Sequence, residues 1–339
     1  MVSLYILRTR RDTMFSKWVG AGIAGLALAL GNAALAAQDY PDKPVKFIVA
    51  SGTASSPDSI SRLVAEKLSA KWGQPVVIEN AAGLGGIIGT ERASRATPDG
   101  YTLVVSTIGA MAVGVSLMDN LPYDPVKDFE PVTMLMAMPN LFVVHPSVPV
   151  KNLQELVAYV KQNPGKLRYG HPGIGTTPHL SAELLKQMTG IQMEGIPYKA
   201  SSQMTTDFLS GQYEVLFHNA SVLLPYVKAG KATLMGITSP KRVRALPDVP
   251  TVAEADTELA DFSVHAWWGL HAPAGTPDAI VQKASKDVAE ILAQAEVTKW
   301  VEDRGGEVGG GTPQDLRAYQ AAETEKWRKL IKEAGIKAN

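Results

Sequence analysis

The chain has 339 residues, with 33 lysines and arginines against 33 aspartates and glutamates, and it has no cysteine. The absence of cysteine excludes a disulfide scaffold, a zinc ribbon and a thiol nucleophile. A formal net charge of zero argues against a basic surface for nucleic acid, so we expect no nucleic-acid partner. With 45% hydrophobic and 19% charged residues the chain is globular, and its length suggests about two domains.

Residues 1–36 have the features of a secretory signal peptide. Basic residues precede the uncharged stretch Trp18 to Leu30, and Ala34-Leu35-Ala36 is similar to a signal-peptidase site. The uncharged stretch has 13 residues, whereas a spanning helix needs about 20. We therefore expect cleavage near Ala36 and a soluble, exported mature protein. A membrane anchor and a twin-arginine signal at Arg10-Arg11 are the alternatives.

The first part of the mature chain alternates β-rich runs with helical patterns. Strands are predicted at 45–50, 75–79 and 101–106, and helices at 59–71 and 90–96. This order is typical of a parallel, doubly wound sheet.

The alternation restarts after an apolar stretch, 132–144, which Met138-Pro139-Asn140 interrupts. It predicts strands at 166–169, 193–198, 213–218, 232–238 and 266–271, and helices at 153–161, 179–188, 202–209 and 222–228. Amphipathic helices at 277–294, 296–303 and 313–334 are expected to end the chain. Two α/β units in series predict two lobes, one formed by residues 37–140 with 263–339 and the other by 141–262.

Two loops lie where open parallel sheets bind ligands, beyond the carboxyl ends of the strands. Each loop leads into a helix N-terminus, whose unpaired N–H groups favour anions. Both loops consist mainly of small and hydroxyl-bearing residues, and Asp58 and Thr176 or Thr177 are expected to cap the following helices. The predicted ligand-binding residues are Ser51, Gly52, Thr53, Ala54, Ser55, Ser56 and Asp58 in the first loop, and Gly170, His171, Gly173, Gly175, Thr176 and Thr177 in the second. Well-capped turns without a ligand are the alternative.

The sequence motifs for cofactor and metal binding are either absent or have the wrong spacing between residues. The glycines within 83–89 do not match the dinucleotide fingerprint, a GxSxG elbow is absent, and the histidines lack metal-ligand spacing. We therefore expect no cofactor and no metal. His218 ends a predicted strand at the cleft and is expected to contact ligand, while Trp267-Trp268 either stack on the ligand or seal a hinge.

Several short motifs follow one another in order along the mature chain. They are Tyr40-Pro41-Asp42-Lys43-Pro44, Trp72-Gly73-Gln74-Pro75, Pro98-Asp99-Gly100-Tyr101, Leu121-Pro122-Tyr123-Asp124-Pro125, Pro164-Gly165-Lys166-Leu167, Ile196-Pro197-Tyr198-Lys199, Ala245-Leu246-Pro247-Asp248-Val249-Pro250 and Ala272-Pro273-Ala274-Gly275-Thr276-Pro277. Together they resemble the Bug-type extracytoplasmic solute receptors, the periplasmic binding components of tripartite tricarboxylate transporters. The resemblance covers nearly the whole mature chain. It implies a two-lobed periplasmic-binding-protein fold, a type II-like Venus flytrap with doubly wound sheets and a ligand cleft between the lobes.

The resemblance also implies a function without bond chemistry. The two loops would hold a small carboxylate, either a di- or tricarboxylate or an aromatic acid, mainly through main-chain N–H groups and hydroxyls, with Tyr198, Ser201 and Asn219 beside them. A two-component membrane permease would accept the ligand from a monomeric receptor. A receptor that presents its ligand to a signalling sensor is one alternative. An organic-acid enzyme built on Ser51, Asp58 and His218 is another.

The chain departs from the family pattern at three places. Ala54-Ser55 and Ala200-Ser201 stand where the family usually carries Gly-Gly, and Phe217-His218 stands where Phe-Asp is usual. An imidazole in place of a carboxylate favours a second anionic or acceptor group on the ligand. We expect these departures to change the ligand rather than the fold.

Overall fold

The computed structural model describes residues 40–198 and 200–337, so the predicted targeting segment lies outside them. The strands are β1 (Val45–Val49), β2 (Val76–Asn80), β3 (Thr102–Thr107), β4 (Phe129–Val144), β5 (Arg168–His171), β6 (Glu194–Pro197), β7 (Val215–Asn219), β8 (Thr233–Ile237), β9 (His265–Pro273) and β10 (Glu307–Gly310). The α-helices are α2 (Ser56–Trp72), α3 (Ile87–Ser94), α4 (Gly114–Leu117), α5 (Leu153–Gln162), α6 (Thr177–Thr189), α7 (Ser201–Leu209), α8 (Ala220–Lys228), α9 (Val252–Ala255), α10 (Asp278–Leu292), α11 (Ala295–Glu302) and α12 (Pro313–Glu333).

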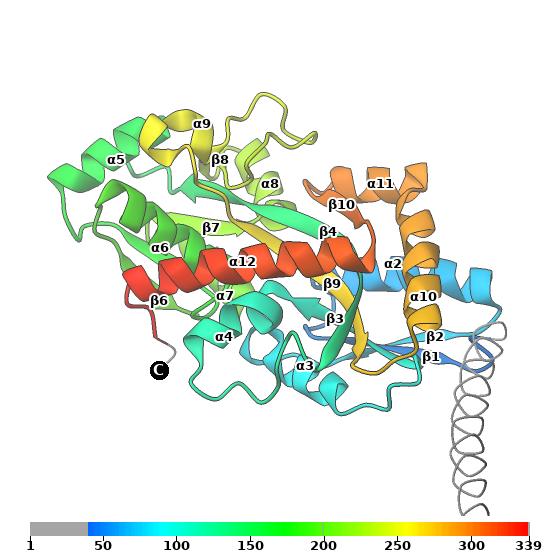
Figure 1. The fold of residues 1–339 in the computed structure, drawn as a ribbon. Coiled ribbons are helices and arrows are strands. Elements are labelled where there is room, and N and C mark those ends of the chain that lie inside the picture. The colour runs from blue at the N-terminus through cyan, green and yellow to red at the C-terminus, as the bar shows by residue number, and fades with distance from the viewer. Residues whose placement is uncertain (1–39, 199, 338–339) are drawn as a thin grey trace, which may run out of the picture.

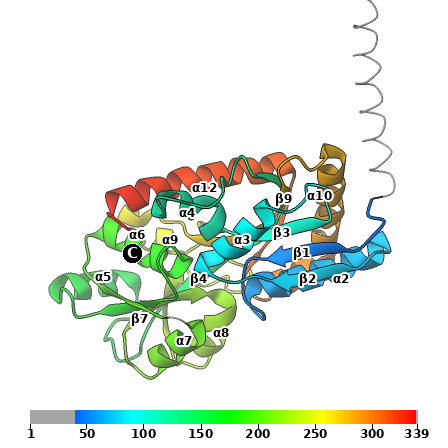
Figure 2. The ribbon, with the colours of Figure 1, turned by 90° about the horizontal axis from the view of Figure 1, so that it is seen from below.

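These strands form one mixed sheet in the order β2-β1-β3-β9-β4-β7-β5-β6, with β10 and β8 also paired to β4 (Figure 1). The two predicted parallel units are confirmed, because β1 pairs in parallel with β2 and β3, and β5 pairs in parallel with β6 and β7. Antiparallel ladders of β9 and β4 join the two units. In Figure 2, β1, β2 and α2 lie at one end of the molecule, and α5, β7, α7 and α8 lie at the other.

Strand β4 corrects one expectation. The predicted interruption at Met138-Pro139-Asn140 is absent, since β4 is a single strand of 16 residues. Up to Pro139, which lies opposite His265, β4 pairs with β9, and from Asn140 it pairs with β7. Proline has no N–H to donate, so the strand accommodates it where the ladder changes partner. The assignment of residues 37–140 with 263–339 and of 141–262 to separate lobes stays a prediction.

The C-terminal region also differs from the expectation of helices alone. Strand β10 adds to the sheet antiparallel to β4, with Glu307 opposite Ala137. A Cβ on Gly309 would lie 2.3 Å from the main-chain oxygen of Met134, so only glycine allows this approach. Helix α12 then runs along the molecule in both views (Figures 1 and 2). None of the helices within the described residues has the length and apolar character that a membrane span requires.

Candidate ligand-binding cleft

A cleft of about 930 Å³ lies where four helices begin. Each of α2, α6, α7 and α8 contributes residues of its first turn to the lining, and these helices come from both ends of the molecule. Met136 and Met138 of β4 and Trp268 of β9 add apolar lining. Helix N-termini carry unpaired N–H groups and a partial positive charge, so their convergence favours an anion.

The two predicted loops meet at this cleft. The predicted site residues that line it are Ser51, Thr53, Ala54, Ser55, Ser56, Thr176, Thr177, Ser201, His218 and Asn219. The remaining predicted site residues are not part of the lining: Gly52, Asp58, Gly170, His171, Gly173, Gly175 and Tyr198. The second loop is shorter than expected, because Gly170 and His171 belong to β5. Contact of any of these residues with a ligand stays a prediction.

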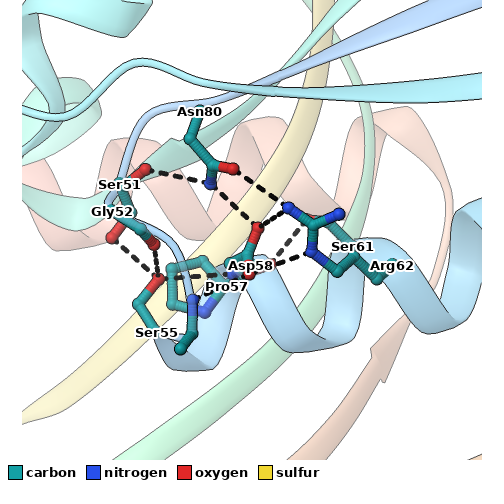
Figure 3. A network of polar contacts seen from close by, with 9 residues as sticks. Ser51, Gly52, Ser55, Pro57, Asp58, Ser61, Arg62 and Asn80 are labelled. Atoms are coloured by element: carbon teal, nitrogen blue, oxygen red, sulfur yellow. Dashed lines mark hydrogen bonds and ion pairs between the residues drawn. The ribbon is translucent and has the colours of Figure 1, made fainter.

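Asp58 lies behind the first loop and fixes its shape (Figure 3). Its Oδ2 accepts hydrogen bonds from the Ala54 N–H at 2.9 Å and from Arg62 Nε at 3.0 Å. Its Oδ1 accepts from Asn80 Nδ2 at 2.9 Å, and the same Nδ2 donates to the Ser51 main-chain oxygen at 3.2 Å. Burial opposes ionisation of this carboxyl, but the hydrogen bonds outweigh burial and lower the pKa of Asp58. One carboxylate thereby joins the loop, α2 and β2.

The N-terminal caps of α2 and α6, the helices that follow the two loops, differ from the expectation. The N-cap of α2 is Ser55, whose Oγ accepts from the Asp58 N–H at 3.4 Å, so the prediction that Asp58 caps α2 is wrong. Thr176 occupies the N-cap of α6, but its hydroxyl donates to the Gly173 main-chain oxygen at 2.6 Å instead of accepting from the helix. In the described part of the chain, α7 and α8 likewise lack a side-chain cap. Their first N–H groups therefore remain available to a ligand at the cleft.

The second loop is positioned by close packing. Gly173 N–H donates to His171 Nδ1 at 3.3 Å. Gly175 has a φ of 78°, and a Cβ there would lie 2.4 Å from Leu117 Cδ1 of α4. Glycine therefore allows both the positive φ and the close contact with the Leu117 side chain of α4 without strain. Behind the loop, the rings of His171 and His179 are both buried, with centroids 4.8 Å apart.

His218 is the last residue but one of β7 and is only 8% exposed where it lines the cleft. Its Nδ1 accepts from the Asn219 N–H at 2.7 Å, and burial lowers the pKa of His218 to about 4. The imidazole is therefore neutral near pH 7. The hydrogen bonds of Ser51 and Asp58 lie within the loop network, where Ser51 Oγ donates to Ser55 Oγ at 3.0 Å. These contacts do not assemble a nucleophile and a base.

Sequence reasoning missed several lining residues. Ser202, Thr205, Thr206, Ser221 and Tyr226 come from α7 and α8, whose hydroxyl-rich starts were a usable signal. Arg304 follows α11 and carried no such signal. Among the described lining residues it is the only one with a formal charge, and its guanidinium lies 4.0 Å from the Trp300 ring centre.

Of the two tryptophans, Trp268 lines the cleft, while Trp267 is fully buried with its ring 5.6 Å from that of Tyr319. Within the described residues, no cluster of potential metal ligands is present.

Comparisons with known proteins agree with this architecture. Residues 60–336 match the family described as "Tripartite tricarboxylate transporter family receptor". Protein BugT of Bordetella pertussis is 32% identical over 320 residues, covering 94% of this chain and 97% of that protein. The structure described as "R. palustris Rpa4515 with adipate" has a TM-score of 0.81 at 35% identity and covers 88% of this chain and 100% of the other. MatC (Rpa3494) from Rhodopseudomonas palustris with bound malate has a TM-score of 0.75 at 31% identity, covering 86% and 100%.

Proposed function

This chain belongs to the family of tripartite tricarboxylate transporter receptors, and from that premise we propose that its cleft captures a small organic carboxylate for delivery to a two-component membrane permease. The receptor is exported by residues 1–36, is cleaved near Ala36 and works as a monomer in the periplasm. The targeting features of the sequence and the family membership support this location.

The convergence of four helix N-termini on one cleft is the observation that carries the proposal. Burying a carboxylate without partners is costly, so nearly every ligand oxygen needs a donor. The uncapped starts of α6, α7 and α8 offer main-chain N–H groups, and the lining serines and threonines offer hydroxyls. No aspartate or glutamate is among the described lining residues, so the cleft does not repel an anion.

Capture proceeds by closure over the ligand. The first loop and the second loop come from separate parallel units of the sheet and line the same cleft, so approach of the two units brings donors of both loops closer to one carboxylate. Closure is then driven by the tighter binding of ligand to the closed state. The adipate and the malate of the two related structures support a dicarboxylate as ligand.

A thermal-shift panel tests the proposal. It compares adipate, malate, succinate, citrate, benzoate and terephthalate with neutral diamides of matched length. At a hundred times its Kd, a ligand stabilises the folded state by about 2.7 kcal/mol, which for a chain of this size corresponds to a rise in Tm of about 4 °C. We expect at least one carboxylate to reach this rise and the diamides to give none. No shift with any acid, or equal shifts with the diamides, contradicts the proposal.

Receptor and enzyme are separated by the fate of the ligand. We expect an acid incubated with an equal amount of protein to stay chemically intact, as followed by proton NMR. Conversion of the acid at a rate that scales with protein concentration would support the enzyme alternative instead.

A further inference from the structure

Six buried side-chain atoms lack a hydrogen-bond partner within the described residues, and only one of them belongs to a residue of the cleft. The atoms are Ser116 Oγ, Asn140 Oδ1, His179 Nδ1, His218 Nε2, His265 Nε2 and Trp267 Nε1. Of these residues, only His218 lines the cleft. An unsatisfied buried polar group costs about 1–3 kcal/mol, so a partner is expected at this position.

The hydrogen bond at the other ring nitrogen fixes the tautomer of His218. The Asn219 main-chain N–H lies 2.7 Å from Nδ1 and can only donate, so Nδ1 is the acceptor. In the neutral ring the proton is then on Nε2. Nδ1 is held against the main chain, and Nε2 lies at the opposite edge of the ring. Among the described residues, His218 thus combines a place in the cleft lining with a neutral Nε2–H that has no hydrogen-bond partner, and protonation of Nδ1 would break the bond to Asn219.

The surroundings of His218 are suited to a hydrogen-bond acceptor. Ser201 and Thr205 of α7 and Ser221 of α8 line the same cleft, and both helices begin there without a side-chain cap. Hydroxyls and main-chain N–H groups all donate to an anionic oxygen, whereas an ammonium group needs acceptors. The helix dipoles disfavour a positive charge at the same place.

We propose that His218 determines specificity by donating its Nε2–H to an acceptor on the bound ligand. This acceptor lies at the second end of the ligand, the end away from its first carboxylate group. The chain thereby selects ligands whose second end is an unprotonated acceptor, above all a second carboxylate, over ligands with a methyl or an ammonium group there. This inference rests on the proposed carboxylate-binding function and names the ligand class of the same cleft.

The test measures Kd by calorimetry for three matched sets of ligands with the purified mature protein. The sets are succinate, butyrate and γ-aminobutyrate; adipate, hexanoate and ε-aminocaproate; and terephthalate, benzoate and aminomethylbenzoate. Within the set that binds, the dicarboxylate should bind about 10- to 100-fold more tightly than the monocarboxylate, as expected for a hydrogen bond to a charged group, and the ammonium-bearing acid should bind most weakly.

Substitutions of His218 assign this preference to one side chain. H218F keeps a ring without a donor and should abolish the preference for the dicarboxylate. H218Q keeps an N–H near the Nε2 position and should retain most of it, and H218D should reverse the order in favour of the ammonium-bearing acid. H145F is the matched control, because His145 bonds Ser147 and is not part of the cleft lining. Melting curves of the ligand-free variants verify folding.

The outcomes separate this inference from the proposed function. Binding of carboxylates with equal affinity for all second ends, or a preference that H218F leaves intact, overturns the role of His218 and leaves the receptor function standing. Loss of the preference in both H218F and H218Q would assign the effect to packing and would also overturn the inference. Failure of every probe to bind the unmodified protein contradicts the carboxylate receptor itself.

Discussion

The two loops that meet at the cleft are held in place by different physical means. A buried carboxylate ties the first loop to α2 and β2, because Asp58 accepts from Ala54, Arg62 and Asn80 (Figure 3). The second loop depends on close packing, since Gly175 fits against Leu117. Charge-assisted hydrogen bonds hold a loop within its own unit, whereas packing against α4 makes the position of the second loop depend on another part of the molecule. The first loop is therefore preformed, whereas the position of the second loop depends on where α4 lies.

The largest difference between the loops should appear when the carboxylate is removed. Asp58→Ala leaves the Ala54 N–H and Asn80 without their buried acceptor, so we expect a loss of about 3 kcal/mol in the free energy of unfolding. Ligand affinity should also fall, although Asp58 does not line the cleft. Urea unfolding and calorimetry measure the two effects.

Asp315→Ala is the matched control for Asp58→Ala. Asp315 occupies the same third position of α12 and completes a capping box with Thr312, but it is exposed. We expect a clearly smaller loss of stability there and no change in ligand affinity. Equal losses in the two variants would show that buried Asp58 stabilises the fold no more than an exposed carboxylate at the same helix position, and would remove the contrast between the loops.

The next largest effect should be a loss of folding stability in mild acid that arises behind the second loop and not at the first. Burial lowers the pKa of His179 behind the second loop to about 4, with a contribution from His171, whereas unfolded histidine has a pKa near 6.5. The stabilisation from neutral His179 is complete above about pH 6.5 and is lost as the pH falls toward 4. At pH 5 the loss is about 2 kcal/mol, from about 1.36 kcal/mol per pH unit.

Urea unfolding at pH 7 and pH 5 measures this contribution. His179→Leu should lose less stability than the unmodified protein over this interval, by about 2 kcal/mol. Asp58→Asn should not change the loss over the same interval, because the lowered pKa of Asp58 places its contribution at lower pH. A pH dependence that His179→Leu leaves unaltered would contradict the assignment.

Packing of the second loop should affect binding more than folding. Gly175→Ala places a Cβ against Leu117, so we expect affinity to fall about tenfold as the loop is displaced. Gly190→Ala is the control, because Gly190 has a similar φ of 71° but a Cβ there would have no atom within 4 Å, and it should cost only about 1 kcal/mol of stability. Restored affinity in the double variant Gly175→Ala with Leu117→Ala confirms the contact. Unchanged affinity in Gly175→Ala rejects it.

The smallest effect should come from a residue outside both loops. Arg304 is exposed, so its attraction for an anion is screened. We expect Arg304→Gln to weaken carboxylate binding about threefold at low salt and to have no effect near 1 M salt. Arg328→Gln, the same charge change away from the cleft lining, should leave affinity unchanged. A salt-independent loss in Arg304→Gln would indicate direct, desolvated contact instead.

Local patterns in the sequence were sufficient for the parallel units and for the position of both loops. Glycine, serine and threonine between a β-rich run and a helical pattern predicted site residues of which Ser51, residues 53–56 and residues 176–177 line the cleft. The network of Asp58 was not predictable, because its partner Asn80 lies on a neighbouring strand and nothing local indicates which strands pair. The continuity of β4 through Pro139 likewise depends on the change of partner from β9 to β7, which is a tertiary property.

The central claim is that loops from separate parallel units hold one organic anion between them. A crystal structure of the mature protein with the most stabilising carboxylate of the thermal-shift panel tests it most directly. We predict that oxygens of one ligand accept hydrogen bonds from groups within residues 51–56 and also from groups within 176–178. A ligand bound by only one of these loops, or bound outside the cleft, would contradict the account.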